Sequence, residues 1–359
     1  MTHGDKNIII SEILQRWYDE NRRQLPWRET SDAYTIWISE IILQQTRVEQ
    51  GMDYFLRFMR HFPDVESLAA VSEQEVMKLW QGLGYYSRAR NLHAASKQIV
   101  SRFNGVFPSK HADIISLKGI GEYTAAAIAS IAFNQPYAAI DGNVFRVVSR
   151  LFAVKQTITT AQGKRIISEL ASAILDKANP GHHNQAMMDF GAMICVPMAP
   201  KCGICVLRTH CLAFEKGIAL QLPIKQKKKP AQHRYFNYFH IETGNKTYIQ
   251  QRKKTDIWKN LYEFPLIETD NKVDLVKLQE KPDFAGLFRN THSFIFHHKL
   301  SVKHVLSHQV IHADFYYVSC NSDAAIALKE NSKIIEIEQE MLQDYPTSRL
   351  IQKYLEMVK

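Results

Sequence analysis

Four cysteines within seventeen residues place the strongest constraint on how this chain folds. They stand at Cys195, Cys202, Cys205 and Cys211, and their spacing is Cys-x6-Cys-x2-Cys-x5-Cys. Four thiolates in so short a loop can hold zinc or an iron–sulfur cluster, and free thiols in that number indicate a reducing compartment. One close pair flanked by single cysteines favours a four-iron cluster over zinc, because structural zinc sites usually combine two close pairs. We therefore expect a [4Fe–4S] loop over residues 195–211.

Length and composition indicate a soluble chain with more than one domain. Its 359 residues exceed what one hydrophobic core usually serves. With 45% hydrophobic and 23% charged residues, it is not a disordered, collagen-like or coiled-coil chain. The net charge of +9 suits a polyanionic partner. The longest uncharged stretch, residues 123–140, is interrupted by Asn134, Gln135 and Pro136, so it predicts a buried helix followed by a turn and no membrane crossing.

Residues 8–215 predict a series of helices. Apolar residues recur at helical spacing through runs such as IWISEIILQQTRVEQGMDYFLRFM, and Ser72 with Glu75 predicts a capping box. This helical pattern of apolar residues ends before Leu222, and the composition changes after it. We therefore predict an all-α N-terminal domain over residues 1–222.

A lysine-rich segment, residues 223–231, follows and is predicted to be a solvated linker, although its charges would also suit phosphate groups. Beyond it, runs such as HRYFNYFHIE, NKTYIQQRK and HKLSVKHVLSHQVIHADFYYVSC predict strands, with a turn at Gly244–Asn245. The last thirty residues have a helical pattern. These features predict an α+β domain over residues 232–359.

A glycine-containing turn supplies a second motif. Leu117-Lys118-Gly119-Ile120-Gly121 precedes a predicted helix over residues 124–133, and glycines there let backbone amides approach a phosphate. Alone, this motif is a weak signal, because two glycines before a helix usually form only a turn. Together with the cysteine spacing it resembles the hairpin of the helix–hairpin–helix, iron–sulfur DNA glycosylases, with Lys118 in place of the usual proline. The resemblance implies an all-α glycosylase domain, a [4Fe–4S] cofactor and phosphate contacts at Gly119 and Gly121.

Two carboxylates are candidates for the chemistry. Asp141 opens the predicted helix NVFRVVSRLF, where an aspartate ordinarily serves as an N-cap. In the family, the aspartate at this position stabilises the positive charge that builds on the sugar, and the N-cap role is compatible with it. The resemblance implies that Tyr123 and Asn143 steady Asp141.

Glu40 lies in WISEIILQQT, and its neighbours on a helix are apolar. It is either an edge side chain that reaches solvent or a carboxyl in a partly dry pocket, where a raised pKa would keep it protonated as a general acid. The string resembles the MutY-type adenine glycosylases, in which this glutamate protonates the departing adenine. Tyr123 stands where glycosylase–lyases place a nucleophilic lysine, and a tyrosine cannot form a Schiff base. The resemblance therefore implies a monofunctional enzyme.

The same resemblance assigns residues that contact DNA. Gln45 and Tyr85 match residues that wedge into the duplex when a base is extruded, although Tyr85 could also be a core aromatic. The positions that match the adenine pocket are Arg28, Leu43, Val48 and Gln185.

Two strings in the second domain extend the resemblance. WKNLYEFP, residues 258–265, resembles the GLWEFP string of the MutY-type C-terminal domain, with Asn260 in place of glycine. VLSHQVIH resembles the FSH loop that recognises 8-oxoguanine, with Leu306 in place of phenylalanine and with Ser307 and His308 kept. A serine there is otherwise only a turn hydroxyl. The domain also resembles Nudix folds, but no run resembles the Nudix box, so pyrophosphate hydrolysis is not expected.

These motifs identify the chain as a member of the MutY-type adenine DNA glycosylases. We expect a monofunctional base excision repair enzyme that removes adenine opposite 8-oxoguanine or guanine. The alternatives are a glycosylase–lyase for oxidised pyrimidines and a non-catalytic iron–sulfur protein that binds mismatches. The expected partner is double-stranded DNA with these mispairs, the expected state is a monomer, and no protein partner is indicated. A bacterial-type cytoplasmic, nucleoid-associated location follows from this function.

Overall fold

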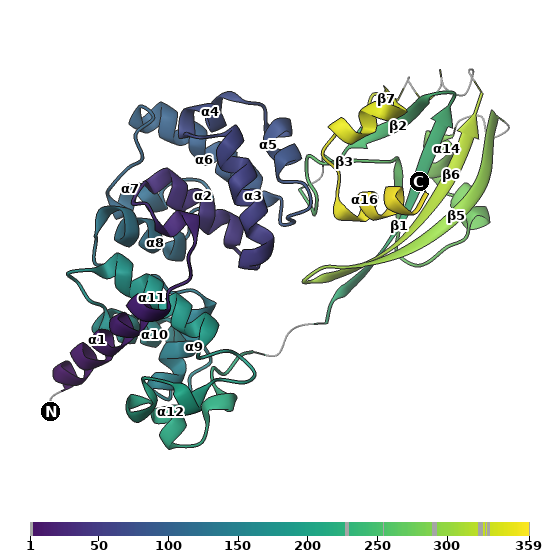
Figure 1. The fold of residues 1–359 in the computed structure, drawn as a ribbon. Coiled ribbons are helices and arrows are strands. Elements are labelled where there is room, and N and C mark those ends of the chain that lie inside the picture. The colour runs from purple at the N-terminus through teal and green to yellow at the C-terminus, as the bar shows by residue number, and fades with distance from the viewer. Residues whose placement is uncertain are drawn as a thin grey trace. The chain divides into compact units, whose positions relative to one another are not determined.

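The computed structural model describes residues 3–226, 230–253, 255–288, 293–321, 326, 328 and 331–358, so residues 227–229 of the predicted linker lie outside the described residues. The chain divides into two compact units (Figure 1). One comprises Met1–Ala70 with Asn91–Lys227, and the other comprises Val71–Arg90 with Lys228–Lys359.

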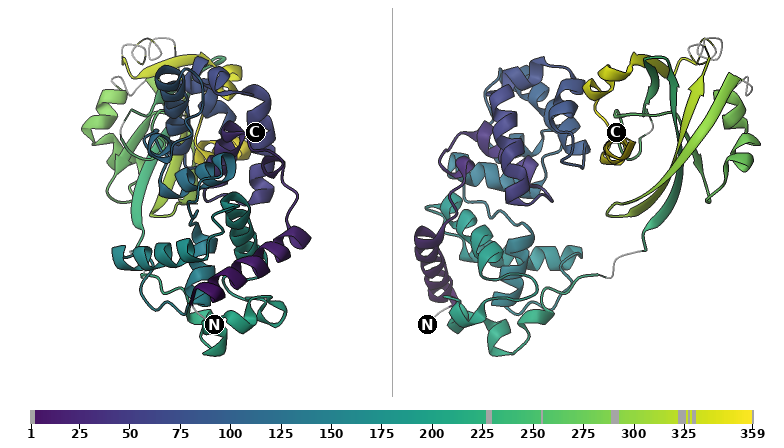
Figure 2. Two further views of the ribbon diagram at one scale, coloured as in Figure 1. Left: turned by 90° about the vertical axis from the view of Figure 1, so that its left-hand side faces the viewer. Right: turned by 45° about the vertical axis from the view of Figure 1, so that its right-hand side comes forward.

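The chain up to residue 226 is helical, as predicted (Figures 1 and 2). Its elements are α1 (His3–Asn21), η1 (Pro26–Arg28), α2 (Ala33–Leu43), α3 (Val48–His61), α4 (Val65–Ala70), α5 (Glu73–Leu79), α6 (Ser87–Phe103), α7 (His111–Ile115), α8 (Glu122–Phe133), α9 (Gly142–Leu151), α10 (Ala161–Ile174), α11 (Pro180–Met193), η2 (Cys202–Ile204), η3 (Arg208–His210), α12 (Leu212–Glu215) and η4 (Ala219–Gln221). In the described part of the chain, no helix has the length and apolar character needed to cross a membrane.

Local signals set several helix ends. Ser72 and Glu75 form the predicted capping box at the start of α5. Helix α8 is buried and ends at Asn134, whose φ of 49° lies in the left-handed region that asparagine tolerates. This arrangement confirms the predicted buried helix followed by a turn.

One long periodic run is two helices rather than one. The apolar spacing of residues 36–59 continues across a break between Leu43 and Val48, where Gln45 has a φ of 57°. Periodicity did not reveal the break because apolar residues keep the same spacing on both sides of it. The break places Gln45 at a turn rather than on a helix face.

The second unit is built on a seven-stranded sheet of order β3-β2-β1-β6-β5, with β4 paired to β1 and β7 paired to β2. The strands are β1 (Gln232–Thr243), β2 (Lys246–Gln251), β3 (Tyr262–Glu263), β4 (Leu266–Thr269), β5 (Phe294–Val305), β6 (Gln309–Cys320) and β7 (Ile334–Glu338). Helices α13 (Leu275–Gln279), α14 (Pro282–Leu287) and α16 (Arg349–Val358) and the short turn η6 (Gln339–Asp344) accompany the sheet, and the segment Val71–Arg90 adds α5 to this unit. The α+β prediction is therefore confirmed.

Alternation along β1 gives this sheet a core on each face. Phe239 and Ile241 pack into a cluster with residues of α13 and α14, while Phe236 and Tyr238 pack into a cluster with residues of α16. Strands β1 and β6 pair in parallel, and β5 and β6 form an antiparallel hairpin whose turn is residues 306–308. This turn contains the predicted lesion loop.

The helical prediction for the last thirty residues is only partly right. Residues 334–338 form β7, which pairs with β2, and the helix begins at Arg349. The run IIEIE is five residues long, and a run this short fits a strand and a helix turn equally well by apolar pattern.

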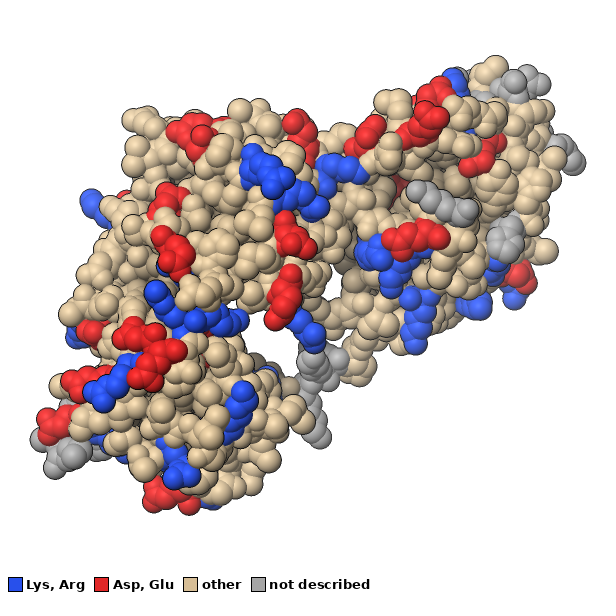
Figure 3. All heavy atoms as spheres, in the orientation of Figure 1, with Lys and Arg blue, Asp and Glu red and all other residues tan. Residues whose placement is uncertain are grey.

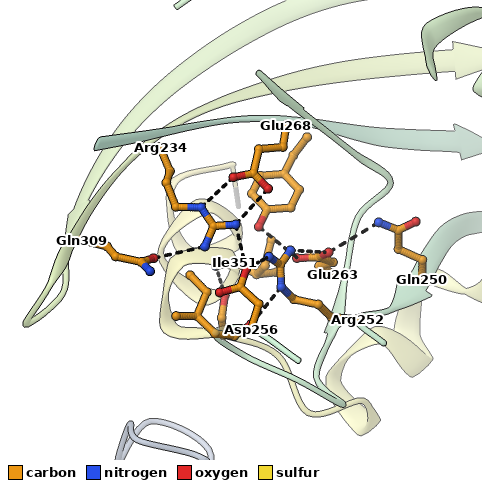
Figure 4. A network of polar contacts seen from close by, with 11 residues as sticks. Arg234, Gln250, Arg252, Asp256, Glu263, Glu268, Gln309 and Ile351 are labelled. Carbon is orange, nitrogen blue, oxygen red and sulfur yellow. Dashed lines mark hydrogen bonds and ion pairs between the residues drawn. The ribbon is translucent and has the colours of Figure 1, made fainter. Parts of the chain in front are cut away.

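A network of ion pairs and hydrogen bonds lies at the turn end of the β5–β6 hairpin (Figure 4). The Arg234 guanidinium donates to Glu268 at 2.6 and 2.9 Å and pairs with Asp256 at 2.7 Å. Its third arm donates to the side chain of Gln309, the first residue of β6, at 3.1 Å. Charge-assisted bonds of this kind are stronger and more directional than neutral ones, so the network holds β1, β4 and the start of β6 in one register.

Candidate active site

One cavity in the first unit brings together most of the predicted site residues. Its volume is about 870 Å³, and α2, α8, α11 and the start of α9 contribute to its wall. The predicted residues that line it are Arg28, Glu40, Leu43, Gln45, Val48, Gly119, Gly121, Tyr123, Asp141, Asn143 and Gln185. Tyr85, Ser307 and His308 belong to the second unit and lie outside this cavity. The carboxylates, the hairpin glycines and the predicted purine contacts thus share one space.

Glu40 meets the requirement for a general acid near neutral pH. Burial raises the pKa of its carboxyl to about 7, and the negative charge of Asp141 acts in the same direction. The resemblance assigned Tyr123 to Asp141, but its hydroxyl donates to Glu40 Oε2 at 2.5 Å. This hydrogen bond and the more distant charge of Arg28 oppose the rise. A carboxyl with this pKa is partly protonated at pH 7 and can give its proton to a leaving group.

Asp141 is the N-cap of α9, as predicted. Its Oδ1 accepts from the backbone N–H groups of Asn143 at 2.8 Å and Val144 at 2.7 Å, and its Oδ2 accepts from Asn143 Nδ2 at 2.8 Å. Burial raises the pKa of Asp141, while these three hydrogen bonds lower it. The bonds fix the direction of a carboxylate that lines the cavity beside Glu40.

Asn143 is itself held by an arginine that sequence reasoning missed. Arg146 donates to Asn143 Oδ1 at 2.8 Å, and it also donates to the carbonyl oxygens of Gly191 at 2.6 Å and Cys195 at 2.6 Å. Hydrogen bonds therefore run from Asp141 to the first cysteine of the loop. Arg146 lies three residues after Asn143 on α9, and this spacing is the local signal that could have indicated the contact.

Arg28 is anchored from behind the cavity wall. Asp189 is fully buried and accepts from Arg28 Nη1 and from Arg28 Nη2 at 2.7 Å. Arg23 donates to the same carboxylate through Nε at 2.8 Å and Nη2 at 2.5 Å. Two guanidinium groups thus share one buried carboxylate, and they hold the pKa of Asp189 below its usual range. Asp189 is the one acidic residue of helix α11 and stands in its apolar second half, and this was the local signal for the residue.

Gln185 has a defined orientation as well. Tyr18 donates from its hydroxyl to Gln185 Oε1 at 2.9 Å, and the Arg28 guanidinium lies 5.6 Å from the centre of the Tyr18 ring. The Gln185 amide nitrogen is therefore the end of that side chain left to serve as a donor within the cavity.

The hairpin turn has the backbone that its glycines allow. Gly119 has a φ of 77°, and a Cβ there would lie 2.5 Å from Asn91 Cβ, so only glycine fits. A Cβ at Gly121 would meet open space, and Gly121 is the N-cap of α8. The amides at the start of α8 are thus accessible at the positive end of the helix dipole.

Gln45 and Tyr85, the two predicted wedge residues, both have left-handed backbones. Their φ values are 57° and 47°, in a region that side chains other than glycine rarely adopt. Tyr85 is 46% exposed, which excludes the alternative that it is a core aromatic. Backbone strain of this kind persists where the surrounding structure fixes it and is concentrated at functional sites.

The predicted lesion loop is the turn between β5 and β6. Ser307 and His308 are exposed there, while Leu306 is partly buried and packs against the core on the α16 side of the sheet. Leu306 thus fills a position at the edge of that core. Asn260, which stands for a glycine of the family string, has a φ of 66°, so asparagine adopts the backbone that a glycine would supply.

The four clustered cysteines line one cavity in the first unit, next to the buried Arg150. Arg150 donates to the carbonyl oxygens of Val196 and Pro197 at 2.8 Å and to Cys195 Sγ at 3.4 Å. Burial raises the pKa of Cys205 to about 11, and the neighbouring thiols add to this effect, so thiolates here need a cation. Across the described residues, no three His, Cys, Asp or Glu side chains form a ready site for a single metal ion. Four thiols around one cavity suit a polynuclear cluster.

Comparisons with known proteins agree with both halves of the fold. The family of HhH-GPD superfamily base excision DNA repair proteins matches residues 38–173, and the NUDIX domain family matches residues 237–357. The adenine DNA glycosylase of Buchnera aphidicola subsp. Acyrthosiphon pisum (strain APS) is 33% identical over 352 residues, which cover 98% of each chain. This chain belongs to the adenine DNA glycosylase family. Within the family, the Mus musculus protein is 41% identical over 223 residues, 59% of this chain and 43% of that protein.

Solved structures resemble the helical part. A thermostable thymine-DNA glycosylase is 28% identical with a TM-score of 0.55, and it is matched over 59% of this chain and 98% of its own. An endonuclease III–DNA complex matches over 61% of this chain and 99% of its own, with a TM-score of 0.52 and 20% identity, which shows the fold alone. The predictions of family, fold class and DNA glycosylase activity are thereby confirmed, and the lyase and mismatch-sensor alternatives are not favoured.

Proposed function

We propose that the chain is a monofunctional adenine DNA glycosylase that hydrolyses the N-glycosidic bond of adenine opposite 8-oxoguanine or guanine. The observation that carries this proposal is the pairing of Glu40 and Asp141 in one cavity, one partly protonated near pH 7 and the other fixed by three hydrogen bonds. This is the two-carboxylate logic of glycosidases, with a base as the leaving group.

In this proposal, Glu40 donates the proton and Asp141 stabilises the positive charge on the sugar. Glu40 gives its proton to the adenine ring as the bond to C1′ breaks, and the bonding electrons leave with the purine. The C1′ centre then carries positive charge, which the Asp141 carboxylate stabilises, either as an ion pair or as a transient covalent adduct. Water completes the hydrolysis, and its proton restores the acid form of Glu40. Tyr123 holds the Glu40 carboxyl in place at 2.5 Å, and Asn143 does the same for Asp141 at 2.8 Å.

The other predicted residues take supporting roles. Arg28 and Gln185 present donors to the purine, and Leu43 and Val48 supply apolar contact beside it. Gly119 and Gly121 bind phosphate, and Gln45 and Tyr85 replace the stacking that is lost when adenine leaves the duplex. Ser307 and His308 read the opposite base. Cys195, Cys202, Cys205 and Cys211 would hold a [4Fe–4S] cluster, which fastens the loop.

Domain limits and location follow as proposals too. We place the glycosylase domain at residues 1–222, the linker at 223–231 and the lesion-recognition domain at 232–359. A duplex-bound enzyme of this kind would be found with the nucleoid.

One experiment separates the possible activities. A duplex with adenine opposite 8-oxoguanine is incubated with the chain, and strand breaks are scored with and without alkali. A monofunctional glycosylase produces breaks only after alkali, because the abasic site must be cleaved chemically. Breaks without alkali would show a lyase, and intact adenine in a duplex that is bound would show a sensor. Either result would refute the proposal.

A further inference from the structure

A polar hollow of about 190 Å³ opens on one face of the sheet in the second unit. Phe239 and Tyr316 lie on this face and pack under α13 and α14. Tyr235 and His312, four residues earlier on the same strands, point to the same side but line the hollow instead. The face is thus covered by helices at one end and open at the end nearer the hairpin turn.

Three aromatic rings form a flat stack beside this hollow. The centres of the Tyr235 and His312 rings are 4.9 Å apart with 14° between their planes, and those of His312 and His233 are 5.1 Å apart with 20°. His233 Nδ1 lies 2.9 Å from His312 Nε2. In the sheet, Tyr235 pairs with His312, and His312 pairs with Lys303 on β5. Aromatic rings next to cations are a combination that nucleic-acid-binding proteins use, with the cations contacting the phosphates.

The charges around the hollow are positive overall. Lys272 and Lys303 line it and are exposed. Its one carboxylate, Asp314, is already engaged, because Lys299 pairs with it at 2.8 Å and Ser301 donates to it at 2.5 Å. Within the parts of the chain that are described, no carboxylate is recorded in an ion pair with Lys272 or Lys303.

This concentration matters because charge is mixed elsewhere. On the face shown in Figure 3, basic and acidic side chains are interspersed over both units. The net charge of +9 therefore does not form one broad positive field on that face, and contacts with phosphates depend on local clusters. The hollow is such a cluster. Of its two lysines, Lys303 lies on β5, the strand that leads into the lesion loop, and Lys272 lines the same hollow.

The hairpin sets the distance from the hollow to that loop. Lys303 is four residues before Ser307, and a strand advances about 3.3 Å per residue, so the turn at Ser307 lies at most about 13 Å from Lys303. One strand of a DNA duplex advances about 3.4 Å per nucleotide along the axis. A phosphate at the hollow would therefore lie roughly three or four nucleotides from the base that Ser307 reads.

We propose that His233, Tyr235, Lys272, Lys303 and His312 form a second DNA-binding surface, which grips the phosphates about three or four nucleotides from the 8-oxoguanine on the same strand. We call these five residues the flanking surface. The proposal rests on the proposed function, because it takes the turn at Ser307 as the lesion reader. It adds a sequence-independent grip that would keep the loop on the lesion strand while the adenine is extruded from the other strand.

The first test measures salt dependence. The double variant Lys272→Gln/Lys303→Gln is compared with wild type for binding to a duplex whose deoxyadenosine carries a 2′-fluoro group, which resists excision. The logarithm of the association constant falls linearly with the logarithm of the salt concentration, and each phosphate contact contributes about 0.9 to the steepness of that fall. Loss of two contacts should therefore make the slope shallower by roughly 1.8. The matched control, Lys277→Gln/Lys281→Gln, removes the same charge from the exposed Lys277 and the partly buried Lys281, neither of which lines the hollow, and its slope should equal that of wild type.

Two further arms assign the effect to a place. Lys272→Arg/Lys303→Arg keeps both charges and should keep the wild-type slope. Single phosphates of the lesion strand are then replaced by neutral methylphosphonates. Wild type should lose affinity at about the third or fourth position from 8-oxoguanine, and the Lys272→Gln/Lys303→Gln variant should be indifferent there.

The proposal is overturned if the salt slope of the double variant equals that of wild type. It is also overturned if wild type loses no affinity when methylphosphonates replace the phosphates at those positions. In either case the hollow would bind an acidic protein partner or only solvent. Adenine release by wild type is measured in parallel on the unmodified duplex. If the methylphosphonate profile holds but no adenine is released, the proposed function fails while the flanking surface stands.

Discussion

Replacing Tyr123 with phenylalanine removes the hydroxyl that donates to Glu40 Oε2 at 2.5 Å and keeps the ring in place. A hydrogen bond to a carboxylate favours the charged form, so it lowers the pKa of Glu40 against the larger effect of burial. Without it, the pKa of Glu40 rises above its value of about 7. A hydrogen bond to a charged group contributes about 1.5–3 kcal/mol, and 1.36 kcal/mol corresponds to one pKa unit, so we expect a rise of roughly one to two units.

The sign of the effect on the rate follows from the role of Glu40. A general acid works in its protonated form, so adenine release falls as pH rises through the pKa of Glu40. In Tyr123→Phe this fall should begin about one to two pH units higher than in wild type. The measurement is the single-turnover rate of adenine release at saturating enzyme, from about pH 5 to pH 10, with binding measured separately at each pH.

Tyr18→Phe is the matched control. It removes a buried tyrosine hydroxyl from the same unit, but that hydroxyl donates to Gln185 rather than to Glu40. Its pH profile should therefore fall at the wild-type position, whatever its absolute rate. A Tyr123→Phe profile that does not move, or that moves to lower pH, would refute the assignment of Glu40 as the protonated acid.

Four further outcomes are expected. Glu40→Gln should bind mispaired DNA normally and release adenine slower by about two orders of magnitude or more, and wild-type release would reduce Glu40 to an edge residue. Asp189→Asn leaves Arg28 and Arg23 without their counter-charge, so it should lower the pKa of Glu40, and the fall in adenine release should begin at a lower pH than in wild type. Anaerobically purified protein should be brown, with absorption near roughly 410 nm and iron on elemental analysis, and Cys202→Ser should reduce the iron content; zinc without iron would contradict the cluster. Ser307→Ala should lower the preference for 8-oxoguanine over guanine by about 2- to 13-fold and truncation after Leu222 by more, and a truncated chain with the full preference would place recognition in the first domain.

Short strings identified the catalytic candidates, because each string carries its own local geometry. Asp141 could be assigned as an N-cap from its position before an amphipathic helix, and the cap bonds at 2.7 and 2.8 Å follow from that position. The apolar helical neighbours of Glu40 left open an edge side chain that reaches solvent, and the resemblance of the string around it to the MutY-type glycosylases assigned it as the acid. The roles of these residues in catalysis stay predictions until the variants are measured.

Features that depend on residues far apart in the chain could not be predicted. Asp189 anchors Arg28 across 161 residues, and no pattern in either segment indicates the pairing. The break at Gln45 and the strand β7 were missed for a different reason, since apolar spacing alone does not distinguish a broken helix from a continuous one, or a five-residue strand from a helix turn. Both errors concern short segments where tertiary contacts decide the backbone.

Arg23 and Arg28, which line the cavity, are paired with the buried carboxylate of Asp189 and not with Glu40. A cation in direct contact with Glu40 would lower the pKa of that carboxyl and leave too little acid form at neutral pH. Asp189 pairs with both guanidinium groups, so Arg28 can line the cavity while part of its charge is offset by a fully buried carboxylate. Asp141 works in the same direction, since its negative charge raises the pKa of Glu40 while its hydrogen bonds hold it ready for the sugar. Burial therefore maintains the acid form of Glu40, together with Asp141 at the start of α9 and Asp189 on α11. Changing the charge of either aspartate should appear first in the pH profile and only then in the rate maximum.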